Sequence, residues 1–158
     1  MTERLKYSNY EIVFQEVPDE VSLAINITGC PYRCEGCHSS HLYSYYGENL
    51  TDNIRSLLEK YSGLITCVCF MGGDQNIEDL TTAVYIAKGL ELKTCVYSGS
   101  EVMDKFLSLL PFLDYLKVGR YNNALGGLSS KTTNQRFYKV KNSALTDITS
   151  IFHTERIS

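Results

Sequence analysis

Three cysteines stand within eight residues of one another, in the stretch CPYRCEGC that begins at Cys30, continues through Cys34 and ends at Cys37. The residues between them are Pro, Tyr, Arg, Glu and Gly, which do not make a core-filling run. This C-x3-C-x2-C spacing can wrap three thiolates around one corner of an iron-sulfur cube. A fourth cysteine would close a 4Fe-4S cluster, whereas three leave one iron open to a molecule that binds and reacts. We therefore predict a cluster whose fourth ligand is a substrate.

A structural zinc site is the alternative interpretation of the same cysteines. It would be of Cys3His type, completed by His38 or His41. Structural zinc sites usually pair two short ligand hooks, and no second hook with suitable spacing follows. The remaining cysteines, Cys67, Cys69 and Cys95, lie inside apolar runs. Because cysteine in a buried strand commonly acts as a small apolar side chain, we predict that these three belong to the core.

The elements that would position the cysteines alternate between strands and helices. Four apolar segments, each closing on or running into a glycine, are predicted as buried strands, at 21–28, 64–71, 91–99 and 113–119. Helical spacing of apolar residues predicts helices at 51–63, 76–90 and 100–110. A short strand is expected at 137–140. This order predicts an α/β fold with a parallel sheet and right-handed crossovers, either open or curved into part of a barrel.

Each of the four strands is followed by a stretch of unusual composition. The cysteine segment follows the first, MGGD (71–74) the second, YSGS (97–100) the third and GRYNN (119–123) the fourth. Ligands of open α/β sheets bind beyond the carboxyl ends of the strands, so one shared pocket would account for all four. Taken alone, Gly-Gly-Asp is an ordinary turn. Its position, after the strand that follows the cysteine segment, favours a site.

Composition limits the classes of protein that fit. With 158 residues, 44% of them hydrophobic, the chain is predicted to form a single domain over 1–158. A net charge of -3 and scattered basic residues do not favour a nucleic-acid partner. No apolar run is long enough to cross a membrane, and the first residues lack the apolar core of a secretion signal. We expect a cytoplasmic protein.

The quoted motifs together resemble a known family. CPYRCEGC after one strand and MGGD after the next are similar to the signature of the radical S-adenosylmethionine superfamily. The short chain, the TGC lead-in, VYSG, GRY and the late TNQR (133–136) resemble one branch of it, the activating proteins of anaerobic ribonucleotide reductase. The resemblance covers roughly residues 20–140.

The resemblance implies a fold, a cofactor set and a partner. The fold would be a parallel sheet curved into a small, incomplete (β/α) barrel. The cofactors would be a 4Fe-4S cluster and S-adenosylmethionine, whose reductive cleavage would generate a glycyl radical on the reductase catalytic subunit, with electrons from an unidentified donor. The cluster ligands would be Cys30, Cys34 and Cys37. The S-adenosylmethionine-binding residues would be Gly36, Cys37, His38, Gly72, Gly73 and Asp74.

The chain departs from the family pattern in two places, with His38 in place of an aromatic residue and Gln75 in place of proline. The resemblance also suggests a partner-facing surface, for which the candidate residues are Arg120, Tyr121, Asn134, Gln135 and Arg136. Three alternatives stay open. These are an activase of another glycyl-radical enzyme of formate-lyase type, a radical enzyme acting on a small molecule, and a non-enzymatic interaction module stabilised by zinc.

Overall fold

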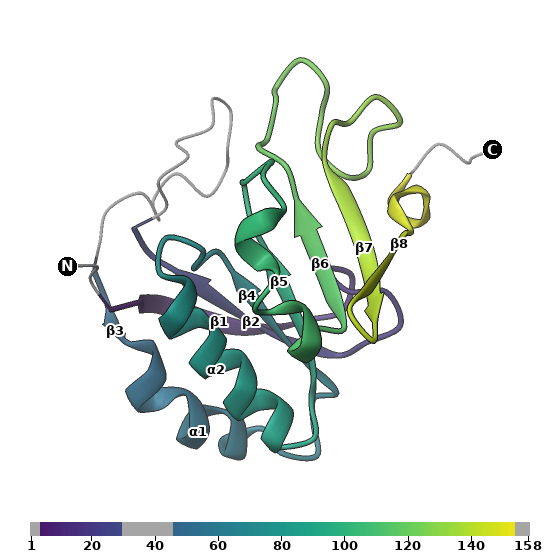
Figure 1. The fold of residues 1–158 in the computed structure, drawn as a ribbon. Coiled ribbons are helices and arrows are strands. Elements are labelled where there is room, and N and C mark those ends of the chain that lie inside the picture. Colours follow the sequence, from purple (N-terminus) through teal and green to yellow (C-terminus); the bar gives the residue numbers. More distant parts are fainter. Residues whose placement is uncertain (1–3, 30–45, 154–158) are drawn as a thin grey trace.

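The computed structural model describes residues 4–29 and 46–153, which form an eight-stranded sheet and two α-helices (Figure 1). The strands in chain order are β1 (Lys6–Val13), β2 (Ser22–Ile27), β3 (Glu48–Asn49), β4 (Cys67–Met71), β5 (Lys93–Tyr97), β6 (Tyr115–Val118), β7 (Arg136–Lys141) and β8 (Ala144–Asp147). The helices are α1 (Leu50–Lys60) and α2 (Ile77–Gly89), and short 3₁₀ turns are formed by η2 (Asp104–Phe106), η3 (Leu110–Phe112) and η4 (Thr149–Phe152). Neighbouring strands follow the order β3-β1-β2-β4-β5-β6-β7-β8.

Four adjacent strands, β2, β4, β5 and β6, pair in parallel at the centre of the sheet. They correspond to the four strands predicted from the sequence, which are confirmed. Asn26 lies opposite Met71, which lies opposite Tyr97, which in turn lies opposite Lys117. The four strands therefore end at one edge of the sheet, and the segments that follow them leave the sheet at that edge.

The predicted fold class, a parallel sheet curved into an incomplete (β/α) barrel, is wrong. The sheet is mixed, because β1 pairs antiparallel with β2 and β3, and β7 pairs antiparallel with β6 and β8. Parallel pairing requires a crossover, usually a helix. The connections β1–β2 and β6–β7 contain no helix, so the chain turns back antiparallel at both ends of the parallel centre.

The helix predicted over 100–110 is also absent, and the turns η2 and η3 connect β5 to β6 in its place. The Ser100 hydroxyl accepts a hydrogen bond from the Val102 N–H (3.1 Å), and the Ser98 hydroxyl accepts one from the Ser100 N–H (2.9 Å). Such side-chain bonds to the backbone compete with helix formation. Pro111 lies in η3 and provides no N–H to an α-helical ladder.

Both α-helices lie on one face of the sheet (Figure 1). Each begins at an asparagine cap, since Asn49 accepts the Asp52 N–H (2.9 Å) and Asn76 accepts the Asp79 N–H (3.1 Å). The main core lies between these helices and the sheet; its largest fully buried members include Leu23, Ile25, Ile54, Leu58, Phe70, Leu80 and Phe106. No helix in residues 4–29 and 46–153 is both long and apolar enough to cross a membrane.

A second, smaller core lies on the opposite face. It joins the side chains of Cys67, Cys69, Cys95, Tyr115 and Phe137 to Val17 from the β1–β2 connection. Near the end of the described chain, the Phe152 ring packs on Phe137 with ring centroids 4.8 Å apart. Glu20, in the β1–β2 connection, pairs with Lys93 at the start of β5 (2.8 Å) and accepts a hydrogen bond from the Thr66 hydroxyl directly before β4 (2.6 Å). These bonds attach the β1–β2 connection to the sheet.

Candidate functional site

The predicted cluster ligands Cys30, Cys34 and Cys37 and the neighbouring Gly36 and His38 lie outside the described residues. Only the ends of this part of the chain are defined. Thr28, directly after β2, is fully buried, and its hydroxyl accepts a hydrogen bond from the Tyr46 N–H (3.2 Å) and donates one to the Tyr46 carbonyl oxygen. The chain therefore leaves the sheet and returns to it at one place, directly before and after the cysteine-bearing segment.

The Gly-Gly-Asp motif follows β4 and lies beside that place. Gly72 and Gly73 both adopt left-handed backbone conformations, with φ of +106° and +107°. The Gly72 N–H donates to the Tyr97 carbonyl oxygen (2.8 Å). Gln75, the residue directly after the Gly-Gly-Asp motif, donates from its side-chain amide to the Thr28 carbonyl oxygen (2.9 Å). The structure thus brings residues 72–75 to the end of β2, directly before the cysteine segment in the sequence.

Packing as well as backbone conformation requires glycine at position 73. A Cβ atom there would lie 3.1 Å from Leu80 Cδ1 and 3.3 Å from Leu5 Cδ1, both in the main core. At Gly72 the nearest side-chain atom, Ile27 Cβ, would be 3.7 Å away, which is ordinary contact. The backbone conformation alone therefore accounts for glycine at position 72.

Asp74 is a buried carboxylate, with its side chain 2% exposed. Its Oδ2 atom pairs with the Lys105 ammonium at 3.1 Å. Lys105 belongs to η2, in the connection that follows β5. This pair joins the segments that leave two adjacent parallel strands, and it shows that the Asp74 carboxylate is arranged to bind an ammonium group.

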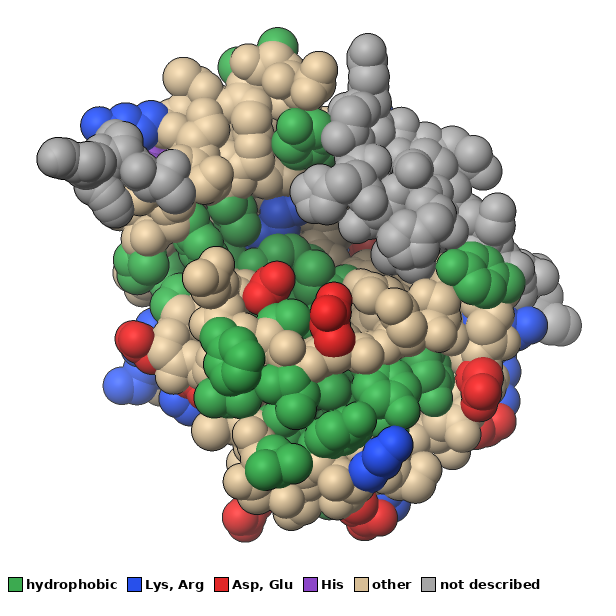
Figure 2. Space-filling view, turned by 180° about the vertical axis from the view of Figure 1, so that it is seen from behind, with side chains coloured by type: hydrophobic (Ala, Val, Ile, Leu, Met, Phe, Trp, Pro, Cys, Tyr) green, Lys and Arg blue, Asp and Glu red, His purple; other side chains and the backbone are tan. Residues whose placement is uncertain are grey.

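Sequence reasoning missed Lys117, which is buried on β6. Its ammonium donates to the Gly119 carbonyl oxygen (3.1 Å) and lies 5.7 Å from the centre of the Tyr97 ring. Lys117 and Tyr97 are on the sheet face opposite the helices, in the row that includes Met71. Figure 2 views the molecule from the side opposite that of Figure 1 and shows a hollow with a basic side chain at its base. A lysine within the apolar strand sequence YLKV was the available signal.

The prediction that Cys67, Cys69 and Cys95 belong to the core is confirmed. All three side chains are fully buried and unpaired by disulfides. Burial raises the pKa of the Cys67 and Cys95 thiols, which keeps them protonated near neutral pH. Within the part of the chain that the structure describes, no three His, Cys, Asp or Glu side chains are grouped closely enough to hold a metal ion.

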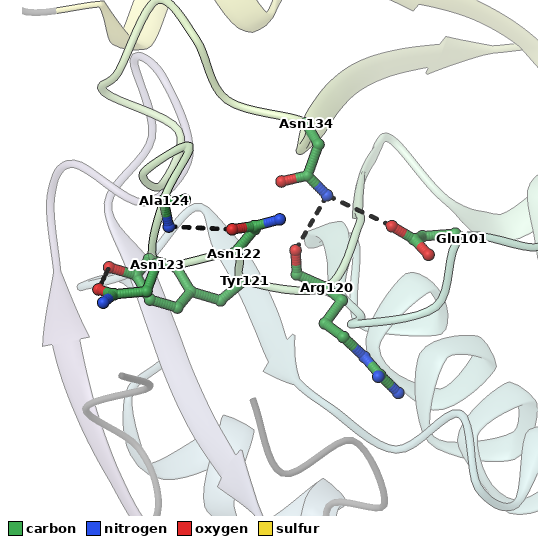
Figure 3. Close-up of a pocket in the computed structure, with 7 residues that line it drawn as sticks. All are labelled: Glu101, Arg120, Tyr121, Asn122, Asn123, Ala124 and Asn134. Atoms are coloured by element: carbon green, nitrogen blue, oxygen red, sulfur yellow. Dashed lines mark hydrogen bonds between the residues drawn. The ribbon is translucent and has the colours of Figure 1, made fainter. Parts of the chain in front are cut away.

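The segments after β5 and β6 form a pocket of about 440 Å³ (Figure 3). Its lining includes three of the predicted surface residues, Arg120, Tyr121 and Asn134, together with Glu101, Asn122, Asn123 and Ala124. Of the other two, Gln135 is buried and donates to the Gly119 carbonyl oxygen (3.2 Å), while Arg136 begins β7 and is exposed. The five residues therefore divide into pocket residues, a structural glutamine and a surface arginine.

Comparison of the chain with protein-family models, with curated proteins and with solved structures finds no match. Any assignment of function consequently depends on the geometry of the strand ends and on the motifs of the sequence. The central observation is that Gly72, Gly73 and Asp74 lie next to the point where the cysteine segment leaves β2.

Proposed function

We propose that the protein activates anaerobic ribonucleotide reductase by generating a glycyl radical on the catalytic subunit. Cys30, Cys34 and Cys37 would hold a 4Fe-4S cluster, and S-adenosylmethionine would bind beside it. When bound, this cofactor pair supplies reductive cleavage of a sulfonium carbon-sulfur bond. We place this activity in the cytoplasm, with an electron donor that is still to be identified.

One observation carries the proposal, the hydrogen bond from the Gln75 side chain to the Thr28 carbonyl oxygen (2.9 Å). It connects the residue that follows the Gly-Gly-Asp motif to Thr28, two residues before Cys30. In the sequence these two motifs are separated by β3, α1 and β4, and the parallel pairing of β2 with β4 brings the segments that follow the two strands to the same edge of the sheet.

The described residues fit the two ends of an amino acid such as the methionine part of S-adenosylmethionine. Asp74 is a buried carboxylate that already binds an ammonium group, that of Lys105. Lys117 provides a buried cation suited to a carboxylate, on the face opposite the helices. In this proposal Asp74 would orient the amino group and Lys117 the carboxylate, while Met71 and Tyr97, which share a row of the sheet with Lys117, would limit the access of water.

The test begins with anaerobic purification and analysis of iron, sulfide and zinc. About four iron atoms per chain are expected, as one cluster requires. Addition of dithionite and S-adenosylmethionine should then yield 5′-deoxyadenosine. A Cys30→Ala/Cys34→Ala/Cys37→Ala variant should lose both properties. Cys67→Ala is the matched control, because it removes a cysteine of the core and should keep both.

The partner is tested by electron paramagnetic resonance after the reduced protein is mixed with the cognate reductase. A glycyl radical signal on the reductase, absent with a formate-lyase type enzyme, supports the proposal. A signal only on the formate-lyase type enzyme would contradict the assignment of the partner. About one zinc atom per chain, with no cleavage of S-adenosylmethionine, would contradict the assignment of the chemistry and favour a zinc-stabilised interaction module.

A further inference from the structure

We propose that the pocket between the segments after β5 and β6 binds the main chain of an extended peptide of the partner protein. The inference rests on the proposed function, because that function requires a backbone glycine of the partner to reach the cofactors. The pocket is open at the surface and has a volume of about 440 Å³. Its side chains match the chemistry of a peptide group better than that of a charged ligand.

Asn134 provides the central hydrogen-bonding group of the pocket. Its amide nitrogen donates to the Arg120 carbonyl oxygen (3.0 Å) and to the Glu101 carboxylate (3.3 Å) (Figure 3). These bonds fix the orientation of the amide. Its Oδ1 atom is buried, and no donor among the described residues bonds to it. A buried acceptor without a donor costs free energy, which an N–H group of a ligand would recover.

Asn122 provides the complementary group. Its Oδ1 atom accepts the Ala124 N–H (2.9 Å), which turns its amide nitrogen toward the space below Asn134 (Figure 3). The pocket wall thus contains a buried acceptor, Asn134 Oδ1, without a donor, and a donor, the Asn122 amide nitrogen, near it. A peptide unit has one N–H donor and one carbonyl acceptor and can satisfy both.

Charge and position favour a peptide of this kind. The pocket contains one carboxylate, Glu101, and one guanidinium, Arg120, so it has no excess charge to select an anion or a cation. Glu101 lies four residues before Lys105, the partner of Asp74. A peptide held in the pocket therefore lies at the same edge of the sheet as the Gly-Gly-Asp motif.

The experiment measures binding of a synthetic peptide that contains the glycine loop of the reductase from the same organism. Asn134→Leu keeps the side-chain volume and removes the amide, and it should weaken binding about tenfold, as loss of one to two hydrogen bonds predicts. Asn53→Ala is the control, since Asn53 lies on α1, outside the pocket lining, and its side chain bonds the nearby Asn49 carbonyl oxygen (2.7 Å). Asn134→Gln should recover part of the affinity.

Two further measurements decide the inference. A peptide methylated on the main-chain nitrogens next to its glycine should bind at least about tenfold more weakly than the unmodified peptide. Equal binding of both peptides, or no difference between Asn134→Leu and the unmodified protein, would overturn the inference. Asn134→Leu should also keep the cleavage of S-adenosylmethionine without partner. If the unmodified protein did not cleave S-adenosylmethionine, the proposed function would be contradicted. The inference about the pocket would still be tested, because peptide binding is measured independently.

Discussion

The side-chain amide of Gln75 donates a 2.9 Å hydrogen bond to the main-chain carbonyl oxygen of Thr28. This bond connects the residue after the Gly-Gly-Asp motif to the residue at which β2 gives way to the cysteine segment. The first is the position at which the chain departs from the proline expected of the resembled family. The amide therefore provides a connection that a proline side chain, which has no donor, cannot make.

Replacing Gln75 by leucine should lower the rate of S-adenosylmethionine cleavage about tenfold, because the two motifs lose their direct connection and a misplaced site reacts slowly. Cleavage is measured as 5′-deoxyadenosine formed under dithionite. The exposed Gln15→Leu serves as the control and should keep the original rate. An unchanged rate in Gln75→Leu would show that the bond to Thr28 has no part in positioning the motif.

The pair of Asp74 and Lys105 gives a second prediction. Asp74→Asn should raise the KM for S-adenosylmethionine about tenfold, since the carboxylate is proposed to bind the substrate amino group. Lys105→Met should change KM less than about threefold, because Lys105 binds the same carboxylate without contacting substrate. Steady-state kinetics distinguish the two variants. If Lys105→Met raised KM as much as Asp74→Asn, the ion pair itself would be the required feature.

Lys117 is expected to serve ligand binding more than stability. Replacement by methionine removes a buried charge and fills a similar volume, so thermal unfolding should show an equal or higher midpoint temperature. The same variant should lose affinity for S-adenosylmethionine, measured by equilibrium binding. Lys117→Arg should recover part of the affinity, and Lys139→Met on β7, an exposed site, should leave it unchanged. A large fall in the midpoint temperature would contradict this division of roles.

Asp147 predicts how stability depends on pH. Burial raises the pKa of this carboxyl, but hydrogen bonds from the Thr149 hydroxyl (2.6 Å) and N–H (2.9 Å) and the Arg136 charge outweigh it, and the pKa lies below its usual 3.8. A carboxyl whose pKa is lowered on folding adds stability above its unfolded pKa. This contribution is lost as the pH falls from above 3.8 through the lower folded value.

Thr149→Val should therefore weaken the dependence of stability on acid. It also removes the acceptor of the buried Phe137 N–H (2.9 Å), so the free energy of unfolding at neutral pH should fall by about 1–3 kcal/mol. The measurement is urea unfolding between pH 3 and pH 7, in steps of about one pH unit. The control is Thr146→Val on the exposed strand β8, which should leave the acid dependence unchanged.

The four parallel strands could be predicted because each is a short apolar run that ends near a glycine, as at Gly72 and Gly119. Of the antiparallel strands, the one predicted at 137–140 is confirmed as part of β7. β1 was not predicted, since it mixes buried and exposed residues with a register shift between Tyr7 and Asn9. The segment over 100–110 has helical spacing, but the Ser98 and Ser100 hydroxyls accept hydrogen bonds from its first backbone N–H groups and favour a different backbone path. The secondary structure of these segments is therefore set by pairing with distant strands and by local side-chain hydrogen bonds, which the spacing of apolar residues does not reveal.

The candidate site shows the same division. The position of Gly72, Gly73 and Asp74 after a strand was readable, because parallel strands share an edge. The pairing of Asp74 with Lys105 depends on the path of the β5–β6 connection, which was predicted wrongly. Lys117 lies in an otherwise apolar strand. The alternation of side chains along a strand shows which residues share a face, but it does not show which face of the sheet would bind a ligand.

The hydrogen bonds between Thr28 and Tyr46 hold together the two ends of the described chain on either side of the cysteine-bearing segment. The described strands and helices form one sheet and a core of side chains drawn from residues 4–29 and 46–153. We expect that replacing 30–45 by a short Gly-Ser linker leaves a folded protein. If the proposed cluster is present, it would then be assembled in a step separate from the folding of the sheet, and its loss to oxygen would leave a folded scaffold able to bind a new cluster.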